Sequence, residues 1–386
     1  MKVGVPKEIQ ENETRVALVP QSIAKLTKSG IEVLVENNAG KAALFSDSEY
    51  EKAGCTIVGN TRELYSSSDL VIKVRKPEFN PNLECHEIDL MKEESTLVSP
   101  LLPEVNLDIV KKLANKKISA FSLDSIPRIT RAQSMDILSS MSTIAGYKGV
   151  MVAANFLPKF FPMLMTAAGT VAPAKVFIIG AGVAGLQAIA TAKRLGAVVE
   201  AFDTRAIVKE QIESLGARFI ELDLGGEETE SKGGYAKQIS KELHQKELEL
   251  IAKQVKKSDV VISTAQIPGK RAPILITEQM VKEMHPGSVI VDLAADQGGN
   301  CELTELGKRI VTDNDVIVCG FLNLPASMPT HASQMFSKNM ESVVAHIVKN
   351  NQINFDLNDE INKGALITHK GVIVQEGIKH LLAGVH

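Results

Sequence analysis

KVFIIGAGVAGLQAIATAKRLGAVVEAFD, residues 175–203, is the stretch that decides the fold of this chain. A continuous apolar strand at 176–179 runs into a G-x-G-x-x-G turn, and a helical pattern follows directly. Gly180 permits the tight turn, Gly182 lets the backbone approach a pyrophosphate, and Gly185 lets the helix pack closely on the strand. Glycines at this spacing between a strand and a helix are typical of a Rossmann dinucleotide-binding unit.

The expected ligand of this turn is NAD(H). Val183 and Ala184 begin the helix, whose free N–H groups and positive dipole end suit the phosphates. Asp203 stands at the end of the next strand, where a carboxylate accepts hydrogen bonds from a ribose 2′-hydroxyl and repels a 2′-phosphate. Thr204 and Arg205 are expected in the same pocket. An arginine there can accommodate a 2′-phosphate, but the acid occupies the strand end where the ribose is expected.

The composition is that of a soluble globular protein. The chain has 386 residues, of which 44% are hydrophobic and 23% charged, and this fits about two or three domains of roughly 100–200 residues. A formal net charge of -3 argues against nucleic-acid binding, which needs a basic face. The charged N-terminus predicts no signal peptide. The most apolar run, 176–192, is interrupted by three glycines and predicts a buried strand and helix.

Cysteine and histidine spacing predicts no metal or redox site. Cys55, Cys85, Cys301 and Cys319 are far apart and form no C-x-x-C pair, so we expect reduced thiols of a cytosolic protein. The eight histidines lack the spacing of metal ligands. We therefore expect no bound metal.

Short apolar runs alternate with helical patterns along most of the chain. In the N-terminal portion, strands are expected at 2–5, 31–36, 69–74 and 118–121, with helices at 20–29 and 103–113. Further along, strands are expected at 176–179, 198–202, 218–222, 259–263, 288–293 and 316–319, with helices at 183–195 and 207–215. Such alternation, with continuous apolar strands, is typical of parallel sheets covered on both faces by helices.

This pattern predicts an α/β protein with two Rossmann-like domains and mostly parallel sheets. A helical segment at 132–156 leads out of the first domain, and another at 332–349 leads back to it. The NAD-binding domain, residues 144–327, is then an insertion in the first domain, residues 1–143 and 328–386.

Five segments resemble a known family. PRITRAQSMDILSS at 127–140 resembles the signature loop of the NAD(H)-binding component of proton-translocating nicotinamide nucleotide transhydrogenase. It is the most specific of the five. The others are 165–170 (MTAAGT), 182–196, 233–237 (GGYAK) and 267–270 (IPGK). The resemblance covers essentially the whole chain.

The resemblance implies a nicotinamide site in the signature loop. In that family an arginine, a glutamine and an aspartate meet at the nicotinamide, and by motif match these catalytic residues are Arg128, Gln133 and Asp136. Arg128 would pair with Asp136, while Asp136 and Ser139 would touch the carboxamide or its ribose. Gln133 would reach toward a second nucleotide held by a partner. The other loop residues expected at the cofactor are Ile129, Thr130, Arg131, Ser134 and Met135.

Spacing alone favours a plainer interpretation of the same loop. Residues 136 and 139 are three apart and share a face of a helix. A charged pair with a glutamine and a serine could simply satisfy backbone groups where that helix begins. The resemblance reverses this preference.

The resemblance also implies a loop that closes over the cofactor. Residues 225–234 (GGEETESKGG) have no apolar side chain, which by composition alone predicts a plain surface loop. In the family this is a mobile loop, and Tyr235 would fold with it over NAD(H) and exclude water. An aromatic packed on the sheet at a helix start is the alternative for Tyr235. Gln266, just before the match at 267–270, is also expected at the cofactor.

Alanine dehydrogenase, a related family with the same architecture, is the alternative. The chain carries Arg15 where that family binds a substrate carboxylate, and Lys73 or Arg75 near its substrate lysine. Residues 296–299 and 324–329 are also similar to the dehydrogenase, and the sequence offers no functional account of them.

A missing histidine favours the transhydrogenase. Oxidation of an amino acid releases protons and needs a positioned acid or base, usually histidine. The dehydrogenase carries one in the region of residues 96–103 (TLVSPLLP), which here has none. His86 is the nearest, and we expect it at the solvated surface. Transfer between two nicotinamides needs only two rings held roughly 3–3.5 Å apart with the reacting carbons aligned.

The resemblance therefore implies reversible hydride transfer from NADH to NADP⁺. NADP(H) would be bound on a partner subunit, and a membrane-embedded subunit would couple the step to proton translocation. This chain would be peripheral on the cytoplasmic side of the inner membrane, as a homodimer. A non-catalytic NAD-sensing module is a third hypothesis.

Overall fold

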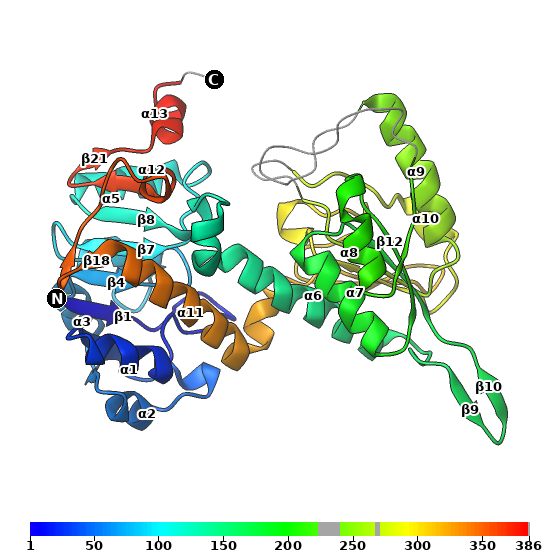
Figure 1. Cartoon of the computed structure of the whole chain (residues 1–386), viewed down its shortest axis with the longest axis horizontal. Coiled ribbons are helices and arrows are strands. Elements are labelled where there is room, and N and C mark those ends of the chain that lie inside the picture. Colours follow the sequence, from blue (N-terminus) through cyan, green and yellow to red (C-terminus); the bar gives the residue numbers. More distant parts are fainter. Residues whose placement is uncertain (223–239, 267–270, 385–386) are drawn as a thin grey trace. The chain divides into compact units, whose positions relative to one another are not determined.

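The computed structural model describes residues 1–222, 240–266 and 271–384. The chain divides into two compact units (Figure 1). Unit 1 comprises Met1–Met141 and Ala326–His386, and unit 2 comprises Ser142–Pro325. The second unit is thus inserted within the first. Within the described residues, no helix combines the length and the apolar character needed to cross a membrane.

Unit 1 is built on an eight-stranded sheet with the order β21-β20-β8-β7-β4-β1-β2-β3. Its strands are β1 (Lys2–Val5), β2 (Glu32–Glu36), β3 (Thr56–Val58), β4 (Leu70–Ile72), β7 (Thr96–Ser99), β8 (Ser119–Ser122), β20 (Leu366–His369) and β21 (Val372–Ile373). The six strands from β3 to β8 are parallel and follow the doubly wound order of a Rossmann fold. The C-terminal strands β20 and β21 extend the sheet antiparallel.

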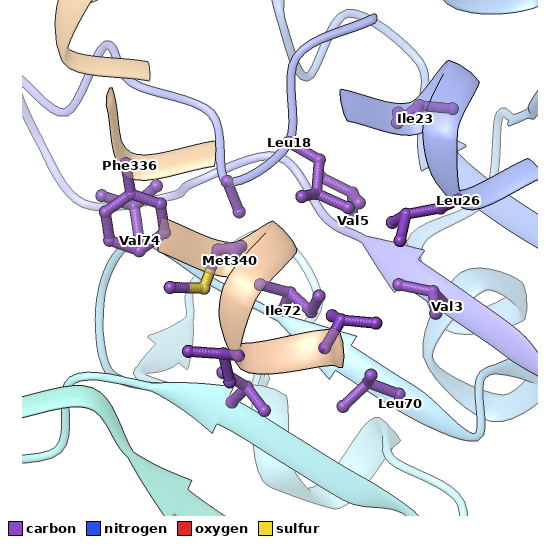
Figure 2. Packing of buried hydrophobic residues seen from close by; sticks show 14 of the residues in the cluster. Val3, Val5, Leu18, Ile23, Leu26, Leu70, Ile72, Val74, Phe336 and Met340 are labelled. Atoms are coloured by element: carbon purple, nitrogen blue, oxygen red, sulfur yellow. The ribbon is translucent and has the colours of Figure 1, made fainter. Parts of the chain in front are cut away.

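Helices from both chain segments cover the sheet of unit 1. They are α1 (Pro20–Lys28), α2 (Asp47–Lys52), α3 (Thr61–Ser67), α4 (Glu87–Leu90), α5 (Leu107–Asn115), α11 (Pro329–Ile347), α12 (Glu360–Ala365) and α13 (Glu376–Leu382). Figure 2 shows Phe336 and Met340 of α11 in the same buried cluster as Val5 and Ile72 of the sheet. Burial of these apolar side chains fixes α11 to unit 1.

Unit 2 repeats the doubly wound order in a seven-stranded sheet, β13-β12-β11-β14-β15-β17-β16. Its strands are β11 (Lys175–Ile179), β12 (Val198–Phe202), β13 (Arg218–Phe219), β14 (Val260–Ser263), β15 (Val289–Asp292), β16 (Arg309–Val311) and β17 (Ile317–Cys319). Among these described strands, only β16 is antiparallel. The helices are α7 (Val183–Arg194), α8 (Lys209–Ser214), α9 (Lys241–Val255) and α10 (Glu278–Lys282), together with most of α6 (Ile137–Phe156). The predicted α/β fold class with two Rossmann-like, mostly parallel sheets is confirmed.

A hairpin stands away from the body of unit 2 (Figure 1). It is formed by β9 (Leu164–Thr166) and β10 (Gly169–Val171), which pair antiparallel. Met165 on this hairpin is 81% exposed, and Met163 just before it is 58% exposed. The hairpin therefore presents apolar side chains to solvent within this chain.

Two expected helices begin later than predicted. The helix expected from residue 103 begins at Leu107, because 103–105 form a turn in which Asn106 donates to the carbonyls of Leu101 and Leu102. The helix expected from residue 132 begins at Ile137, after a 3₁₀ segment, η3 (Thr130–Met135). The strand expected at 218–222 is only Arg218–Phe219.

Candidate functional site

The glycine turn has the steric form that its spacing predicts. Gly180 has φ +93°, and a Cβ on it would lie 2.6 Å from Oγ1 of Thr264. A Cβ on Gly185 would lie 1.9 Å from the carbonyl oxygen of Gly180. A Cβ on Gly182, in contrast, would meet nothing within 4 Å. Two glycines are therefore required by the fold, and the third leaves the backbone open to a ligand.

The helix after the turn presents an uncapped N-terminus. Gly182 is the N-cap residue of α7, and no side chain caps this end. Val183, the first helical residue, is exposed. Helix α6 packs closely underneath, because a Cβ on Gly146 would lie 2.1 Å from the carbonyl oxygen of Ala184. The first-turn N–H groups and the helix dipole suit a phosphate at this position, so the turn fits a dinucleotide.

Asp203 lies directly after β12, with its backbone and side chain 8% exposed together. Its Oδ2 accepts a hydrogen bond from the backbone N–H of Ala181 in the glycine turn, at 2.7 Å. The Arg205 guanidinium binds both carboxylate oxygens, through Nε at 2.9 Å and Nη2 at 2.7 Å. The backbone N–H of Arg205 also donates to Oδ1 at 2.8 Å. Both residues that the sequence placed at the ribose therefore meet, and they meet each other.

The loop after β14 is fastened to the glycine turn. Oγ1 of Thr264 donates to the carbonyl of Gly180 at 3.1 Å. Asn300 holds the next residue, because its Oδ1 accepts from the N–H of Ala265 at 3.0 Å and its Nδ2 donates to the Ala265 carbonyl at 2.9 Å. Nε2 of Gln266 donates to the carbonyl of Leu293 at 3.2 Å. These contacts fix the position of Gln266 relative to the turn.

A buried carboxylate organises this side of unit 2. Asp292, at the end of β15, is fully buried and accepts hydrogen bonds from the N–H groups of Ala294, Asn300 and Cys301. It also accepts from the hydroxyls of Ser263 and Thr304. The loop between Asp292 and Asn300 includes Gly298 at φ +99° and Gly299 at φ +78°, so the segment similar to the dehydrogenase at 296–299 has a structural role.

Sequence reasoning missed Asp292 and Asn300 as positioning residues. Asp292 does carry a signal, since it is an acid at the end of an apolar strand, as Asp203 is. The other dehydrogenase-like segment, 324–329, carries the chain back into unit 1. There Oγ1 of Thr14 donates to the carbonyl of Ala326.

The signature loop of unit 1 begins a helix by capping. Oδ1 of Asp136 accepts from the backbone N–H of Ser139 at 2.9 Å, and Oδ2 accepts from the Ser139 hydroxyl at 2.6 Å. Arg128 and Gln133 are exposed. The plainer interpretation of this loop, a capping network where α6 begins, therefore describes the contacts of Asp136 and Ser139.

The rest of the loop is held by C-terminal elements of unit 1. Arg131 forms an ion pair with Asp359 at 2.5 Å, and Asp359 also caps α12. The charge of Arg131 helps to keep the pKa of Asp359 below its ordinary value, against the effect of burial. Nδ2 of Asn339 on α11 donates to the carbonyl of Ser134 at 2.8 Å. Ile129 is partly buried, Met135 is buried, and Thr130 is exposed.

The cations that resemble the dehydrogenase's substrate ligands are paired with acids. Arg15 is 6% exposed and binds Glu13 through Nε at 2.8 Å and Nη2 at 2.6 Å. Arg75 binds the same carboxylate at 2.7 Å. Burial alone would raise the pKa of Glu13, but the hydrogen bonds and charges of Arg15 and Arg75 lower it to about 2. Glu13 and Arg15 border a cavity of about 190 Å³.

Lys73 lies in a second buried charge cluster. Its ammonium, 1% exposed, contacts Glu87 at 2.9 Å and Glu8 at 3.1 Å. Tyr65 donates to the same Glu87 oxygen at 2.7 Å. Burial disfavours the charge on Lys73, but Glu8, Tyr65 and Glu87 outweigh it and hold the pKa of Lys73 well above its ordinary value. The lysine is therefore a fixed cation.

His86 is a helix cap in the structure. Its Nδ1 accepts from the N–H of Ile88 at 3.2 Å where α4 begins, and the side chain is partly buried, which lowers its pKa. Across residues 1–222, 240–266 and 271–384, no three histidine, cysteine or acidic side chains are grouped to hold a metal ion. Tyr235 and the segment 267–270 lie outside the described residues.

The doubly wound sheets and the glycine turn define a Rossmann-type dinucleotide-binding protein. Two family models match the chain, "Alanine dehydrogenase/PNT, N-terminal domain" over residues 4–145 and "Alanine dehydrogenase/PNT, C-terminal domain" over residues 149–376. The chain belongs to this alanine dehydrogenase/PNT family. The resemblance stated from the signature loop is thereby confirmed.

Within the family, the chain is similar to transhydrogenase subunits. In Rhodospirillum rubrum the NAD(P) transhydrogenase subunit alpha is divided into parts, and the first of them is 46% identical to this chain, over 98% of this chain and 99% of the relative. The crystal structure of the transhydrogenase from Sinorhizobium meliloti matches with a TM-score of 0.84 and 38% identity, covering 98% of this chain and 100% of that chain. Alanine dehydrogenase 2 of Staphylococcus aureus is more distant, at 33% identity over 98% of this chain and 95% of the relative.

Proposed function

We propose that this chain is the NAD(H)-binding component of a proton-translocating NAD(P) transhydrogenase. It would take part in reversible hydride transfer between NAD(H) on this chain and NADP(H) on a partner subunit. The observation that carries the proposal is the open, uncapped glycine turn beside Asp203, in a chain 46% identical to a named transhydrogenase alpha subunit.

The turn would hold the dinucleotide by its phosphates and adenosine ribose. The exposed Gly182 and Val183 and the partly buried Ala184 would contact the pyrophosphate through backbone N–H groups. Asp203 would accept a ribose hydroxyl and disfavour a 2′-phosphate. Thr204 and Gln266 would line the same ligand, and Tyr235 would cover it.

The signature loop would act on the nicotinamide. Arg128 and Gln133 are exposed on unit 1, so both side chains are accessible to a ligand or a partner. Asp136 and Ser139 would bind the carboxamide or ribose, and the capping contacts between them would hold them in a defined arrangement. When bound, the nicotinamides supply the hydride chemistry, and the protein contributes orientation and exclusion of water.

The alanine dehydrogenase alternative requires an acid or base for the amino acid. No histidine occurs at residues 96–103, and His86 is engaged as a cap. The buried acids also neutralise the cations that would bind the carboxylate, Arg15 and Lys73. These observations favour the transhydrogenase over the dehydrogenase and over an NAD sensor without catalysis.

Reconstitution with a partner separates these hypotheses. The purified chain is mixed with an NADP(H)-binding transhydrogenase domain, and reduction of an NAD analogue by NADPH is followed. The proposal expects transfer with the partner and no NADH formation from alanine. Alanine-dependent NADH formation by this chain alone, without transfer, supports the dehydrogenase, and NADH binding without either reaction supports the sensor.

Gln133→Asn tests the role of the signature loop in the same assay. The shortened amide should lose most of the transfer rate while NADH affinity stays within about twofold, because an interaction made only across the reacting pair affects rate rather than binding. Ser134→Ala is the matched control on the neighbouring exposed position. Full turnover by Gln133→Asn would remove Gln133 from the proposed mechanism.

The proposed assembly is a homodimer on the cytoplasmic side of the inner membrane, bound to membrane-embedded and NADP(H)-binding subunits. Support for self-association comes from the β9–β10 hairpin, whose exposed Met165 could be buried against another chain. Sedimentation equilibrium of the purified chain tests the dimer, and co-purification with membranes that contain or lack the partner subunits tests the attachment.

A further inference from the structure

The carboxylate of Asp203 has its acceptor positions filled by the protein itself. A carboxylate offers about four lone-pair directions. Oδ1 accepts from the backbone N–H and Nε of Arg205, at 2.8 and 2.9 Å. Oδ2 accepts from the N–H of Ala181 and from Nη2 of Arg205, both at 2.7 Å. A ribose hydroxyl can therefore bind Asp203 only if one of these donors leaves.

The guanidinium of Arg205 is the donor that can leave. The N–H of Ala181 belongs to the glycine turn, whose conformation is fixed by Gly180 and by packing of α7. The N–H of Arg205 belongs to the backbone directly after β12. The Arg205 side chain, by contrast, is 13% exposed and reaches Asp203 through rotatable bonds. Side-chain rotation frees two acceptor positions without moving the sheet.

We propose that Arg205 competes with the adenosine ribose of NAD(H) for Asp203, and so acts as a positioning residue that sets nucleotide affinity and selectivity. This inference rests on the proposed function, since it assumes NAD(H) at this turn. A fork of two charge-assisted hydrogen bonds must be exchanged for ribose contacts whenever the dinucleotide binds. The same fork neutralises a cation beside Asp203 that could attract a 2′-phosphate.

Binding of separate nucleotide halves to Arg205→Ala tests the competition. NADH, ADP-ribose and reduced nicotinamide mononucleotide are titrated into wild type and variant by calorimetry. Removing the guanidinium should tighten NADH and ADP-ribose on the order of tenfold, because displacement of the charged hydrogen bonds is no longer required. The affinity for the mononucleotide, which has no adenosine ribose, should not change. Arg205→Lys, which keeps one donor, should lie between, and it carries the test if Arg205→Ala does not fold.

Arg218→Ala is the matched control. Arg218 lies on β13 of the same sheet, pairs with Glu200 at 3.4 Å and is 75% exposed in its side chain. The substitution removes one positive charge from unit 2 without touching Asp203. This variant should bind NADH as the wild type does, which separates local competition from a general loss of attraction for phosphates.

Selectivity gives a second, independent readout. Asp203→Asn should release the guanidinium and improve NADPH binding, and the double variant with Arg205→Ala should lose that gain. Equal or weaker NADH binding by both Arg205 variants, with normal binding by the wild type, overturns this inference alone. If the wild type binds neither NADH nor ADP-ribose, the proposed function is overturned together with it.

Discussion

Gly182→Ala and Gly185→Ala form a matched pair that separates ligand binding from folding. Both add one methyl group to the same turn. At Gly185 the new Cβ would lie 1.9 Å from the carbonyl oxygen of Gly180, whereas real Cβ contacts essentially never fall under 3.0 Å. Helix α7 would therefore have to move about 1 Å away from β11, since 3.0 minus 1.9 leaves 1.1 Å.

The magnitudes differ in sign and kind. Overpacking of this type destabilises by about 1–3 kcal/mol or more, and the better helix propensity of alanine returns about 1 kcal/mol, so Gly185→Ala should lose about 2 kcal/mol. Gly182 has φ -74° and an open Cβ position. Its substitution should alter stability by less than about 1 kcal/mol, the effect of a poorer N-cap. A methyl group placed where the pyrophosphate approaches should weaken NADH at least about tenfold, equivalent to about 1.4 kcal/mol.

The assay combines urea unfolding with NADH titration. Unfolding is followed by far-UV circular dichroism, and binding by the fluorescence of NADH itself, which is unobscured because the chain has no tryptophan. Gly59→Ala is the control, since its Cβ also meets nothing within 4 Å and it lies in unit 1. Wild-type NADH affinity in Gly182→Ala would refute the pyrophosphate role, and wild-type stability in Gly185→Ala would refute the packing argument.

Three further substitutions test the charges and hydrogen bonds of the two units. Asp292→Asn turns an amide toward backbone N–H groups and should destabilise unit 2 by about 3 kcal/mol in urea unfolding, while exposed Asp313→Asn should stay within about 0.5 kcal/mol. The lowered pKa of Glu13 contributes stability that is complete above about 4.5 and is lost as pH falls to about 2; it amounts to at most about 3 kcal/mol. Glu13→Gln should flatten acid unfolding in that window, and an unchanged pH profile would contradict the assignment. Tyr50→Phe leaves the buried carbonyl of Leu18 without its 2.8 Å donor and should lower the free energy of unfolding by about 1–2 kcal/mol; an effect below about 0.3 kcal/mol would show that the bond is replaced.

The glycine turn could be predicted because its requirement is local. Gly180 and Gly185 are needed by atoms a few residues away, so spacing alone carries the information. The start of α6 could not be placed in the same way. Apolar Ala132 and Met135 are buried and fit a helical period, yet Asp136 interrupts it by capping the helix that follows. Periodicity reports burial, and a 3₁₀ turn can bury the same positions.

Contacts between distant segments explain what the sequence did not predict. Asp292 gathers donors from three stretches of chain, and only the assembled sheet brings them together. The residues Asp203 and Arg205 were both placed at the ribose from the sequence, but not their bidentate contact. The roles of Arg128, Gln133 and Tyr235 stay predictions, because they depend on ligands and partners.

The chain connectivity of unit 1 has a consequence for protein synthesis. Strand β8 pairs with β20, and all of unit 2 is encoded between them. At about 5–20 residues per second, β20 leaves the ribosome on the order of 10 s or more after β8. During this interval β8 is an edge strand with unpaired backbone groups, a position open to wrong pairing. The strands of unit 2 are contiguous in the chain, so the nucleotide-binding unit can mature first although its translation starts second.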